Sequence, residues 1–200
     1  ETPAETEPST QPSETEPAGP YVVSTATIGS LGDLLMHKPV FDATKYTSAV
    51  QQADGTYDFT CVFEHLAPYT SGMDYAVANL ETTLAGLDNG YSYSGYPNFN
   101  CPDEIIDGMK DAGFDMILTA NNHSYDTRSA GFHRTMQTIA DRGLAFLGTQ
   151  ADAEDPDYML VERDGITLGL MCYTYADNAD PNVKASNGIP LNKADTPLMN

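Results

Sequence analysis

The chain contains 200 residues, 40% of them apolar, and carries a formal net charge of −20 at pH 7. A chain of this length supports one sizeable hydrophobic core rather than two, so one folded domain is expected. No stretch approaches the roughly 18 apolar residues that a membrane-spanning helix needs. The acidic surface repels phosphate backbones, which argues against nucleic acid as a partner.

Residues 1–19 form an acidic segment, rich in Pro and Thr, that is expected to be a disordered linker. It contains five Glu, four Pro and no basic residue, so it cannot bury enough apolar surface to offset the entropy lost on ordering. Such linkers often separate a membrane anchor from an extracytoplasmic domain, which predicts a bacterial cell-surface location for the domain of residues 20–200. The sequence holds no signal peptide or lipid-attachment Cys, so a membrane or lipoprotein-type anchor is expected upstream.

Strand and helix patterns alternate after this segment. Residues 21–30 are rich in β-branched side chains and predict a first strand, followed by a loop that carries Asp33. Residues 58–69 have apolar side chains three and four positions apart, which predicts a short helix that Pro68 ends. Residues 74–80 predict a second, buried strand.

The second half of the chain continues the alternation. Residues 102–113 open with a proline and acidic residues and close at a glycine, as helices do. Residues 114–120 predict a third strand, residues 129–143 a helix and residues 144–149 a fourth strand. Residues 158–175 predict a hairpin around an Asp-Gly dipeptide, which tolerates the positive φ angles of a tight turn. Together these elements predict a layered α/β domain.

The three cysteines, Cys61, Cys101 and Cys172, have neither a CxxC pair nor metal-site spacing. Buried free thiols are the favoured interpretation, because each lies beside apolar residues or a turn. One disulfide with one free thiol stays open for an exported protein.

Three predicted strands end in polar residues that a strand end does not require. In chain order these residues are Asp33, Asn79, Glu81, Asn121, Asn122 and His123. The carboxyl ends of parallel strands form the crevice where ligands bind in sheets flanked by helices, so these side chains are expected to converge if the strands are parallel neighbours. A set of carboxylate, amide and imidazole groups suits Mn, Fe or Zn.

Each of these residues also has a purely structural interpretation. Asp33 is of the type that forms turns or caps helices, and Glu81 is placed to cap a helix-like segment after it. Asn121 and Asn122 are typical of Asx-turns, and His123 of a hydrogen-bonded loop. The convergence of all of them at successive strand ends favours a functional site.

Three motifs carry a resemblance to a known family. The segments GDLLMH at 32–37, ANLETTL at 78–84 and ANNHSYDTRSAGFHRTMQTIADRGLAFLGT at 120–149 resemble the bacterial capsule-synthesis protein CapA family, which is associated with poly-γ-glutamate. That family is similar to the calcineurin-like metallophosphoesterases. The resemblance implies an αββα sandwich with metals bound at strand ends.

The resemblance also implies a role for each matching residue. Asp33 stands at the position of the first metal-binding Asp, Glu81 at the carboxylate that bridges two metals, and Asn122 at the Asn of the Asn-His motif. His123 stands at the catalytic imidazole, which binds a substrate oxyanion or protonates the leaving group, and Asp126 is expected to orient it. The complete protein is then expected to hold two divalent ions, Mn, Fe or Zn.

The sequence departs from the phosphoesterase pattern in two places. Leu35 stands where these enzymes usually carry a His, and for the nearby His37 a metal-binding role and a surface or capping role both stay open. Asn79 and Asn121 are further candidate ligands. The later histidine motifs have no counterpart after residue 133, so the chain is expected to match the N-terminal part of a longer family member, with its fold and metal site incomplete.

Two classes of function follow from the sequence. The first is an extracytoplasmic, metal-dependent hydrolase, like a phosphoesterase, or a transferase. It would act with the capsule-synthesis machinery on a phosphoester or on an anionic, amide-linked polymer such as poly-γ-glutamate. The second is a non-catalytic envelope module that binds or tethers polymer and keeps a vestigial site. An anionic polymer is repelled by the acidic surface unless metal or basic side chains near Lys38, Lys45 or Arg128 screen it.

Overall fold

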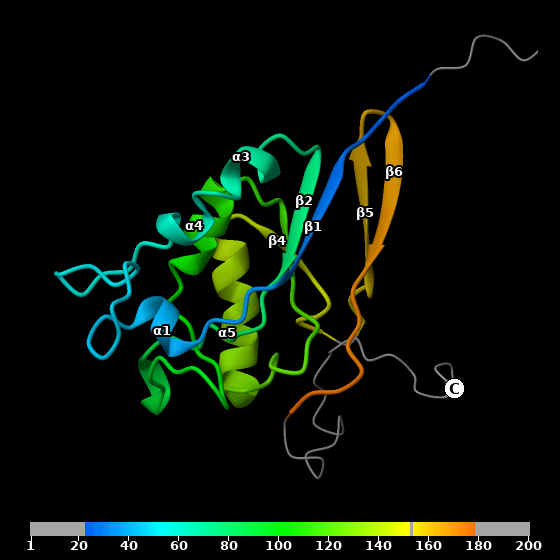
Figure 1. Ribbon diagram of the computed structural model, residues 1–200. Coiled ribbons are helices and arrows are strands. Elements are labelled where there is room, and N and C mark those ends of the chain that lie inside the picture. Colours follow the sequence, from blue (N-terminus) through cyan, green and yellow to red (C-terminus); the bar gives the residue numbers. More distant parts are fainter. Residues whose placement is uncertain (1–22, 153, 179–200) are drawn as a thin grey trace, which may run out of the picture.

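The computed structural model describes residues 23–152 and 154–178 (Figure 1). The predicted linker, residues 1–19, lies outside these residues. Within them, no helix is both long and apolar enough to cross a membrane.

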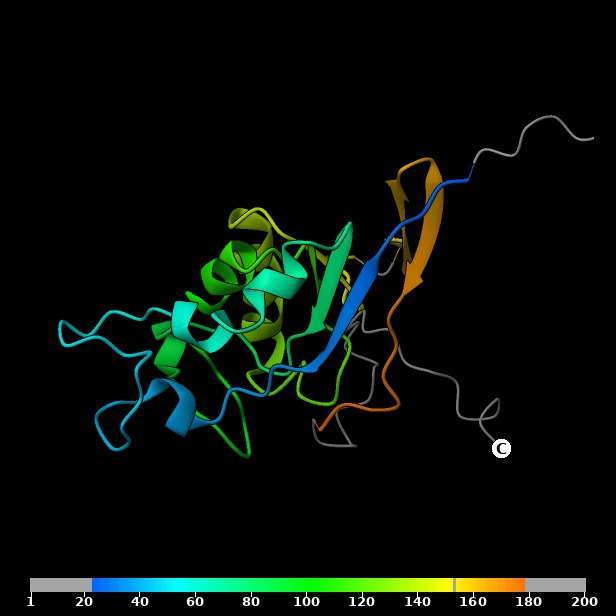
Figure 2. The same ribbon diagram turned by 45° about the horizontal axis from the view of Figure 1, so that its top comes forward.

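A four-stranded parallel sheet forms the centre of the domain. Its strands stand in the order β1 (Ile28–Asp33), β2 (Tyr75–Asn79), β3 (Met116–Leu118) and β4 (Ala145–Leu147). Because each strand pairs with the next one along the chain and parallel crossovers have a single preferred hand, the connecting segments all fall on one face of the sheet. Figures 1 and 2 show the helices gathered on that face.

The helices are short except for the last. They are α1 (Lys38–Phe41), α2 (Thr60–Phe63), α3 (Ala67–Thr70), the 3-10 turn η1 (Asp88–Gly90), α4 (Ile105–Asp111) and α5 (Arg128–Asp141). Helix α5 buries Phe132, Met136 and Ile139, which recur at the spacing of one helical face. Because this face is buried in the core, α5 holds the loop that precedes it close to the sheet.

An antiparallel hairpin, β5 (Tyr158–Arg163) with β6 (Ile166–Met171), covers the other face of the sheet. The turn residues Asp164 and Gly165 have φ angles of 51° and 77°, the positive values that an Asp-Gly turn in a hairpin requires.

Two hydrophobic cores lie on opposite faces of the parallel sheet. Along β2, Ala76 and Ala78 pack against the helices, whereas Tyr75 and Val77 pack toward the hairpin and Val161. This alternation follows from the two-residue period of a strand. The layers are therefore helices, parallel sheet and hairpin. The α/β class predicted from the sequence is confirmed, and the described residues supply three layers of the expected αββα order.

Several element boundaries differ from the prediction. Strand β1 begins at Ile28 rather than at residue 21, because pairing with β2 starts at the contact of Ile28 with Tyr75, and Asp33 ends the strand instead of lying in a loop. The single helix predicted for residues 58–69 is two short helices. Pro68 lies in the first turn of α3 rather than ending a helix, a position where the missing N–H costs no hydrogen bond.

The cysteines are all free, and they differ in exposure. Cys101 is buried and Cys172 half-buried, as expected for structural thiols. Cys61 is exposed, so the expectation of a buried thiol is wrong there, because the start of α2 faces solvent.

Candidate functional site

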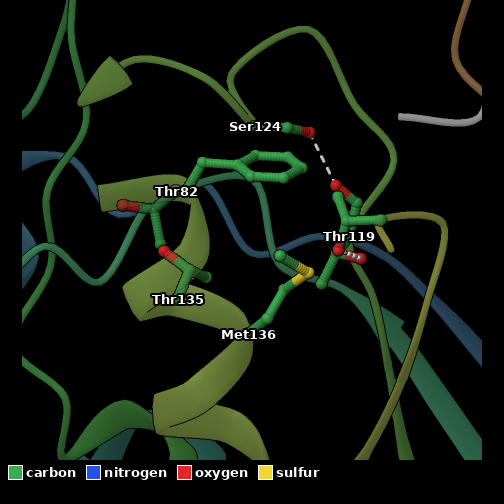
Figure 3. A pocket seen from close by; sticks show the side chains of 7 residues that line it. Thr82, Thr119, Ser124, Thr135 and Met136 are labelled. Atoms are coloured by element: carbon green, nitrogen blue, oxygen red, sulfur yellow. Dashed lines mark hydrogen bonds between the residues drawn. The ribbon is translucent and has the colours of Figure 1, made fainter. Parts of the chain in front are cut away.

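The loop after β3 is held by its own side chains. The side-chain oxygen Oδ1 of Asn121 accepts the N–H of His123 at 3.0 Å, which closes an Asx-turn. Ser124 Oγ accepts the N–H of Asn121 at 2.9 Å and lies 2.6 Å from the carbonyl oxygen of Thr119, to which it donates. Behind the loop, a small cavity separates Ser124 and Thr119 from Met136 on α5 (Figure 3). The loop therefore presents His123 in one orientation.

Asn79, the last residue of β2, connects the three strand ends. Its Nδ2 donates to Asp33 Oδ1 at 2.7 Å, and its Oδ1 accepts from Asn121 Nδ2 at 3.1 Å. Asn121 Nδ2 also donates to the carbonyl oxygen of Leu80 at 2.9 Å. The parallel register that places Asp33 opposite Asn79 creates this chain of hydrogen bonds. Asn79 and Asn121 thus use their side chains to join the strand ends.

Glu81 lies beside Asp33 at the same edge of the sheet. Only 8% of its surface is exposed. Burial raises the pKa of the Glu81 carboxyl, and the neighbouring charge of Asp33 raises it further. Two carboxylates held this close repel one another, so the pair favours either a shared proton or a cation.

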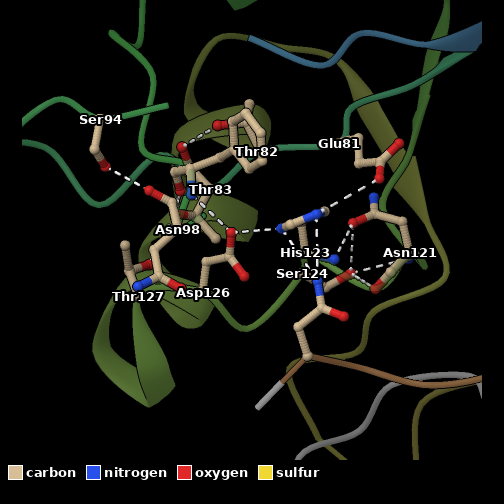
Figure 4. A network of polar contacts seen from close by, with 12 residues as sticks. Glu81, Thr82, Thr83, Ser94, Asn98, Asn121, His123, Ser124, Asp126 and Thr127 are labelled. Atoms are coloured by element: carbon tan, nitrogen blue, oxygen red, sulfur yellow. Dashed lines mark hydrogen bonds and ion pairs between the residues drawn. The ribbon is translucent and has the colours of Figure 1, made fainter. Parts of the chain in front are cut away.

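His123 joins Glu81 to a second, more deeply buried carboxylate (Figure 4). Its Nδ1 lies 2.7 Å from Asp126 Oδ2, and its Nε2 lies 3.9 Å from Glu81 Oε1. Asp126 Oδ2 also accepts the N–H of Phe99 at 2.7 Å. Burial raises the pKa of Asp126, while the Phe99 N–H and His123 oppose the rise. When neutral, the imidazole carries its proton on Nδ1 toward Asp126, which leaves the Nε2 lone pair facing Glu81.

A buried aromatic ring, that of Phe99, packs beside this imidazole, and the sequence did not indicate it. The fully buried ring of Phe99 meets His123 edge to face with ring centres 4.7 Å apart, and meets His37 at 5.0 Å. His37 itself is exposed and occupies the N-cap position of α1 without a side-chain capping bond. It therefore approaches the site only through Phe99.

Asn178, seven residues beyond β6, also reaches the site from far along the chain. Its backbone N–H donates to the carbonyl oxygen of Asn122 at 2.8 Å, and its Nδ2 lies 3.3 Å from His123 Nε2. No motif or spacing in the sequence signals this residue, because the loop between β6 and Asn178 has no regular periodicity.

The structural interpretations hold for some candidates and not for others. Asn121 does form an Asx-turn. Asp33 caps no helix, since α1 begins at Lys38 with His37 as its N-cap. The segment after Glu81 contains no helix for it to cap. The half-exposed Asn122 contacts Asn178 through its backbone oxygen.

The side chains at the strand ends carry the chemical groups that bind divalent cations, but too few of these groups lie together in the described part of the chain. Asp33 and Glu81 offer the hard carboxylate oxygens that divalent ions prefer, and their repulsion favours a cation between them. Within residues 23–152 and 154–178, however, no three His, Cys, Asp or Glu side chains form a group that could hold a metal ion. The described residues therefore do not by themselves supply a two-metal centre.

The raised pKa of Glu81 predicts how stability depends on pH. The folded state binds the Glu81 proton more tightly than the unfolded state, so this stabilisation is complete below the usual pKa of 4.5 and is lost as pH rises through the folded pKa. Without divalent cations, Glu81→Gln is expected to be more stable than the wild type at neutral pH, and the difference should shrink toward pH 4. Urea denaturation across this range measures it.

A control variant removes the same charge from an exposed site. Glu162 lies on the outer face of β5, so Glu162→Gln should show no such pH-dependent gain. A Glu81→Gln difference that grows as the pH falls would contradict the assigned direction of the shift.

The fold and this strand-end edge define an α/β protein that gathers carboxylates and a carboxylate-bound imidazole at the ends of parallel strands. Residues 27–198 match the model of the family described as bacterial capsule synthesis protein PGA_cap. The chain belongs to this family, as the resemblance of its motifs predicted.

Two curated proteins show the same relationship at low identity. The chain is 23% identical to the capsule biosynthesis protein CapA of Bacillus anthracis over 153 residues, which cover 75% of this chain and 35% of that protein. It is 21% identical to the PGA biosynthesis protein CapA of Bacillus subtilis (strain 168) over 146 residues, 72% of this chain and 36% of that protein. The matched part spans about a third of the length of each relative.

Proposed function

We propose that this chain forms the strand-end part of an extracytoplasmic, metal-dependent hydrolase that acts in the synthesis of capsule, poly-γ-glutamate or a related envelope polymer. The polymer context is supported by family membership and by the names of the two relatives. The hydrolytic role is carried by one observation: Glu81, which neighbours Asp33, lies 3.9 Å from Nε2 of an imidazole whose Nδ1 is bound by the buried Asp126. A phosphoester or an amide of an anionic polymer is the proposed substrate.

The residues have distinct tasks in this proposal. Asp33 and Glu81, with the amide of Asn122, would hold a divalent ion of the Mn, Fe or Zn type, and such an ion would supply charge neutralisation and activate water. With protons on both ring nitrogens, His123 would donate the Nε2 proton to the leaving group and be left as the neutral ring, with its remaining proton on Nδ1 toward Asp126. Asp126 keeps the ring in place and stabilises its charged form, as a buried carboxylate does for a catalytic histidine.

Cation binding tests the first of these tasks without any substrate. Mn²⁺ titrated into the protein by calorimetry is expected to bind the wild type and to bind Glu81→Gln at least tenfold more weakly, because one carboxylate of the pair is lost. Glu162→Gln serves as the charge-matched control and should bind like the wild type. Equal Mn²⁺ affinity in all three proteins would show that the carboxylate pair is not a cation site.

Two observations favour the alternative of a non-catalytic polymer-binding module. No three-residue metal group exists in the described part of the chain, and Leu35 stands where a phosphoesterase ligand is usual. A vestigial site would keep its hydrogen bonds and lose turnover. In that case Mn²⁺ should have no effect on polymer binding, which co-sedimentation with poly-γ-glutamate measures.

A further inference from the structure

The segment that follows β6, residues 172–178, crosses to the carboxyl ends of the parallel strands. Figures 1 and 2 show it running from the hairpin toward the end of the sheet where β1 and β2 finish. Cys172 Sγ lies 3.9 Å from the carbonyl oxygen of Ala120, and the Asn178 N–H donates to the carbonyl oxygen of Asn122. Both contacts fall on the loop that carries His123. The segment, here called the strap, therefore holds this loop at two points.

The Asn178 side chain meets the imidazole in an unusual way. Its Nδ2 lies 3.4 Å from Nδ1 and 3.3 Å from Nε2 of His123. A donor in the plane of the ring cannot be this close to both nitrogens at once, because the Cε1 atom stands between them. The amide nitrogen must therefore lie over the face of the ring, the geometry of an N–H contact with an aromatic π face.

Because the Asn178 amide lies over the ring face, both imidazole nitrogens can still make contacts in the plane of the ring. Nδ1 keeps its 2.7 Å contact with Asp126, and Nε2 keeps its direction toward Glu81. Phe99 packs against the same ring at an interplanar angle of 84°. Among the described residues the ring thus has four neighbours, Asp126, Glu81, Phe99 and Asn178, of which only Asn178 comes from outside the parallel-sheet unit.

We propose that Asn178 is a positioning residue for His123: the strap carries its side-chain amide onto the ring face and so fixes the plane in which Nδ1 meets Asp126 and Nε2 faces Glu81. The inference rests on the proposed function, in which His123 transfers a proton, for its catalytic meaning. The position of the ring, however, is measurable without any activity.

NMR of the histidine rings in residues 1–200 tests the contact directly, because the chain has only four histidines. In Asn178→Ala the backbone N–H bond to Asn122 remains. The Cε1–H resonance of His123 is expected to shift and broaden, since the ring loses its cover and samples more orientations. The melting temperature and the resonances of His37, His65 and His133 should stay as in the wild type.

Two further variants separate this role from simple packing. Asn178→Asp keeps the size of the side chain but offers no N–H to the ring, so it is expected to shift the His123 resonance as well. Asn98→Ala makes the same substitution as Asn178→Ala at an exposed loop position near the site and should leave all four resonances unchanged. A His123 resonance in Asn178→Ala that coincides with the wild type overturns the proposal. So does a lowered melting temperature with all four rings affected, which would mark a structural role only.

Turnover supplies a second readout in a chain long enough to complete the site. With bis-p-nitrophenyl phosphate and Mn²⁺, Asn178→Ala is expected to lower kcat about tenfold with KM unchanged. A wild-type kcat for Asn178→Ala, together with a strong loss in His123→Gln, rejects the positioning role and leaves the proposed function standing. If His123→Gln itself keeps the wild-type kcat, the proposed function fails, and the NMR result still decides where Asn178 acts.

Discussion

Replacing His123 by glutamine is expected to lower phosphodiesterase turnover by about 10²–10⁴-fold, the range that a general acid contributes. The loss should appear in kcat rather than KM, because in the proposed function the imidazole would act on the leaving group in the transition state and not on the bound substrate. The measurement uses bis-p-nitrophenyl phosphate with Mn²⁺ in a chain extended toward the length of the curated relatives. Residues 1–200 alone are expected to turn over weakly, because a two-metal site needs more ligands than the described residues bring together.

A second histidine provides the matched control for this substitution. His65 lies between α2 and α3 with 94% of its side chain exposed, so His65→Gln should leave kcat unchanged. If Asp33→Asn abolishes turnover while His123→Gln keeps it, the cation site is real and the proton donor lies elsewhere. Robust turnover by residues 1–200 that depends on Asp33 would show that this part of the chain already holds a sufficient set of ligands, with His37 the first residue to examine.

Truncating Phe99 to alanine is expected to lower the free energy of unfolding by about 3–5 kcal/mol, the usual cost of removing a large aromatic side chain from a core. Phe99 is completely buried and contacts the rings of both His37 and His123. Its backbone N–H, which donates to Asp126, is retained in the variant. The loss of unfolding free energy therefore measures the packing of the Phe99 ring and not its backbone hydrogen bond. Urea denaturation of the protein measures it.

The neighbouring Tyr96 offers a control for the same loop. It is 77% exposed, so Tyr96→Ala should change the free energy of unfolding by no more than about 0.5 kcal/mol. In Phe99→Ala the ring of His123 loses its lateral support, and turnover should fall together with stability. A Phe99→Ala variant as stable as Tyr96→Ala would mean that the Phe99 ring does not pack against the site in the way that the structure shows.

Turns and helices were predicted well where a short stretch of sequence specifies them. The Asp-Gly dipeptide at 164–165 produces the hairpin turn, and the apolar periodicity of residues 129–143 produces α5 within two residues of its observed bounds. Boundaries set by pairing were predicted less well. Strand β1 starts where β2 is available to pair with it, and no property of residues 21–27 announces that limit.

The candidate site shows the same division. The polar residues at three strand ends, and the hydrogen bond between Asp126 and His123 three positions apart, follow from short stretches of sequence and from the rule that parallel strands share a carboxyl edge. That Asn79 joins Asp33 to Asn121 depends on the register of three strands, because these two partners lie 46 and 42 positions away from Asn79 in the sequence. The assignment of Asn79 and Asn121 to this joining role was therefore open until the strands were aligned.

By itself the sequence determined the α/β class, the family and the set of polar residues at the strand ends, because periodicity, turn residues and motifs are properties of neighbouring positions. Only the tertiary structure decided that Phe99 packs against the imidazole and that Glu81 lies beside Asp33. The same holds for Asn178, which lies over the ring of His123 although it is 55 positions away in the sequence. Such contacts arise when crossovers and packing bring distant segments together, and the resulting burial shifts the pKa values of Glu81 and Asp126. Burial and distance in space are collective properties of the folded chain, and no local pattern encodes them.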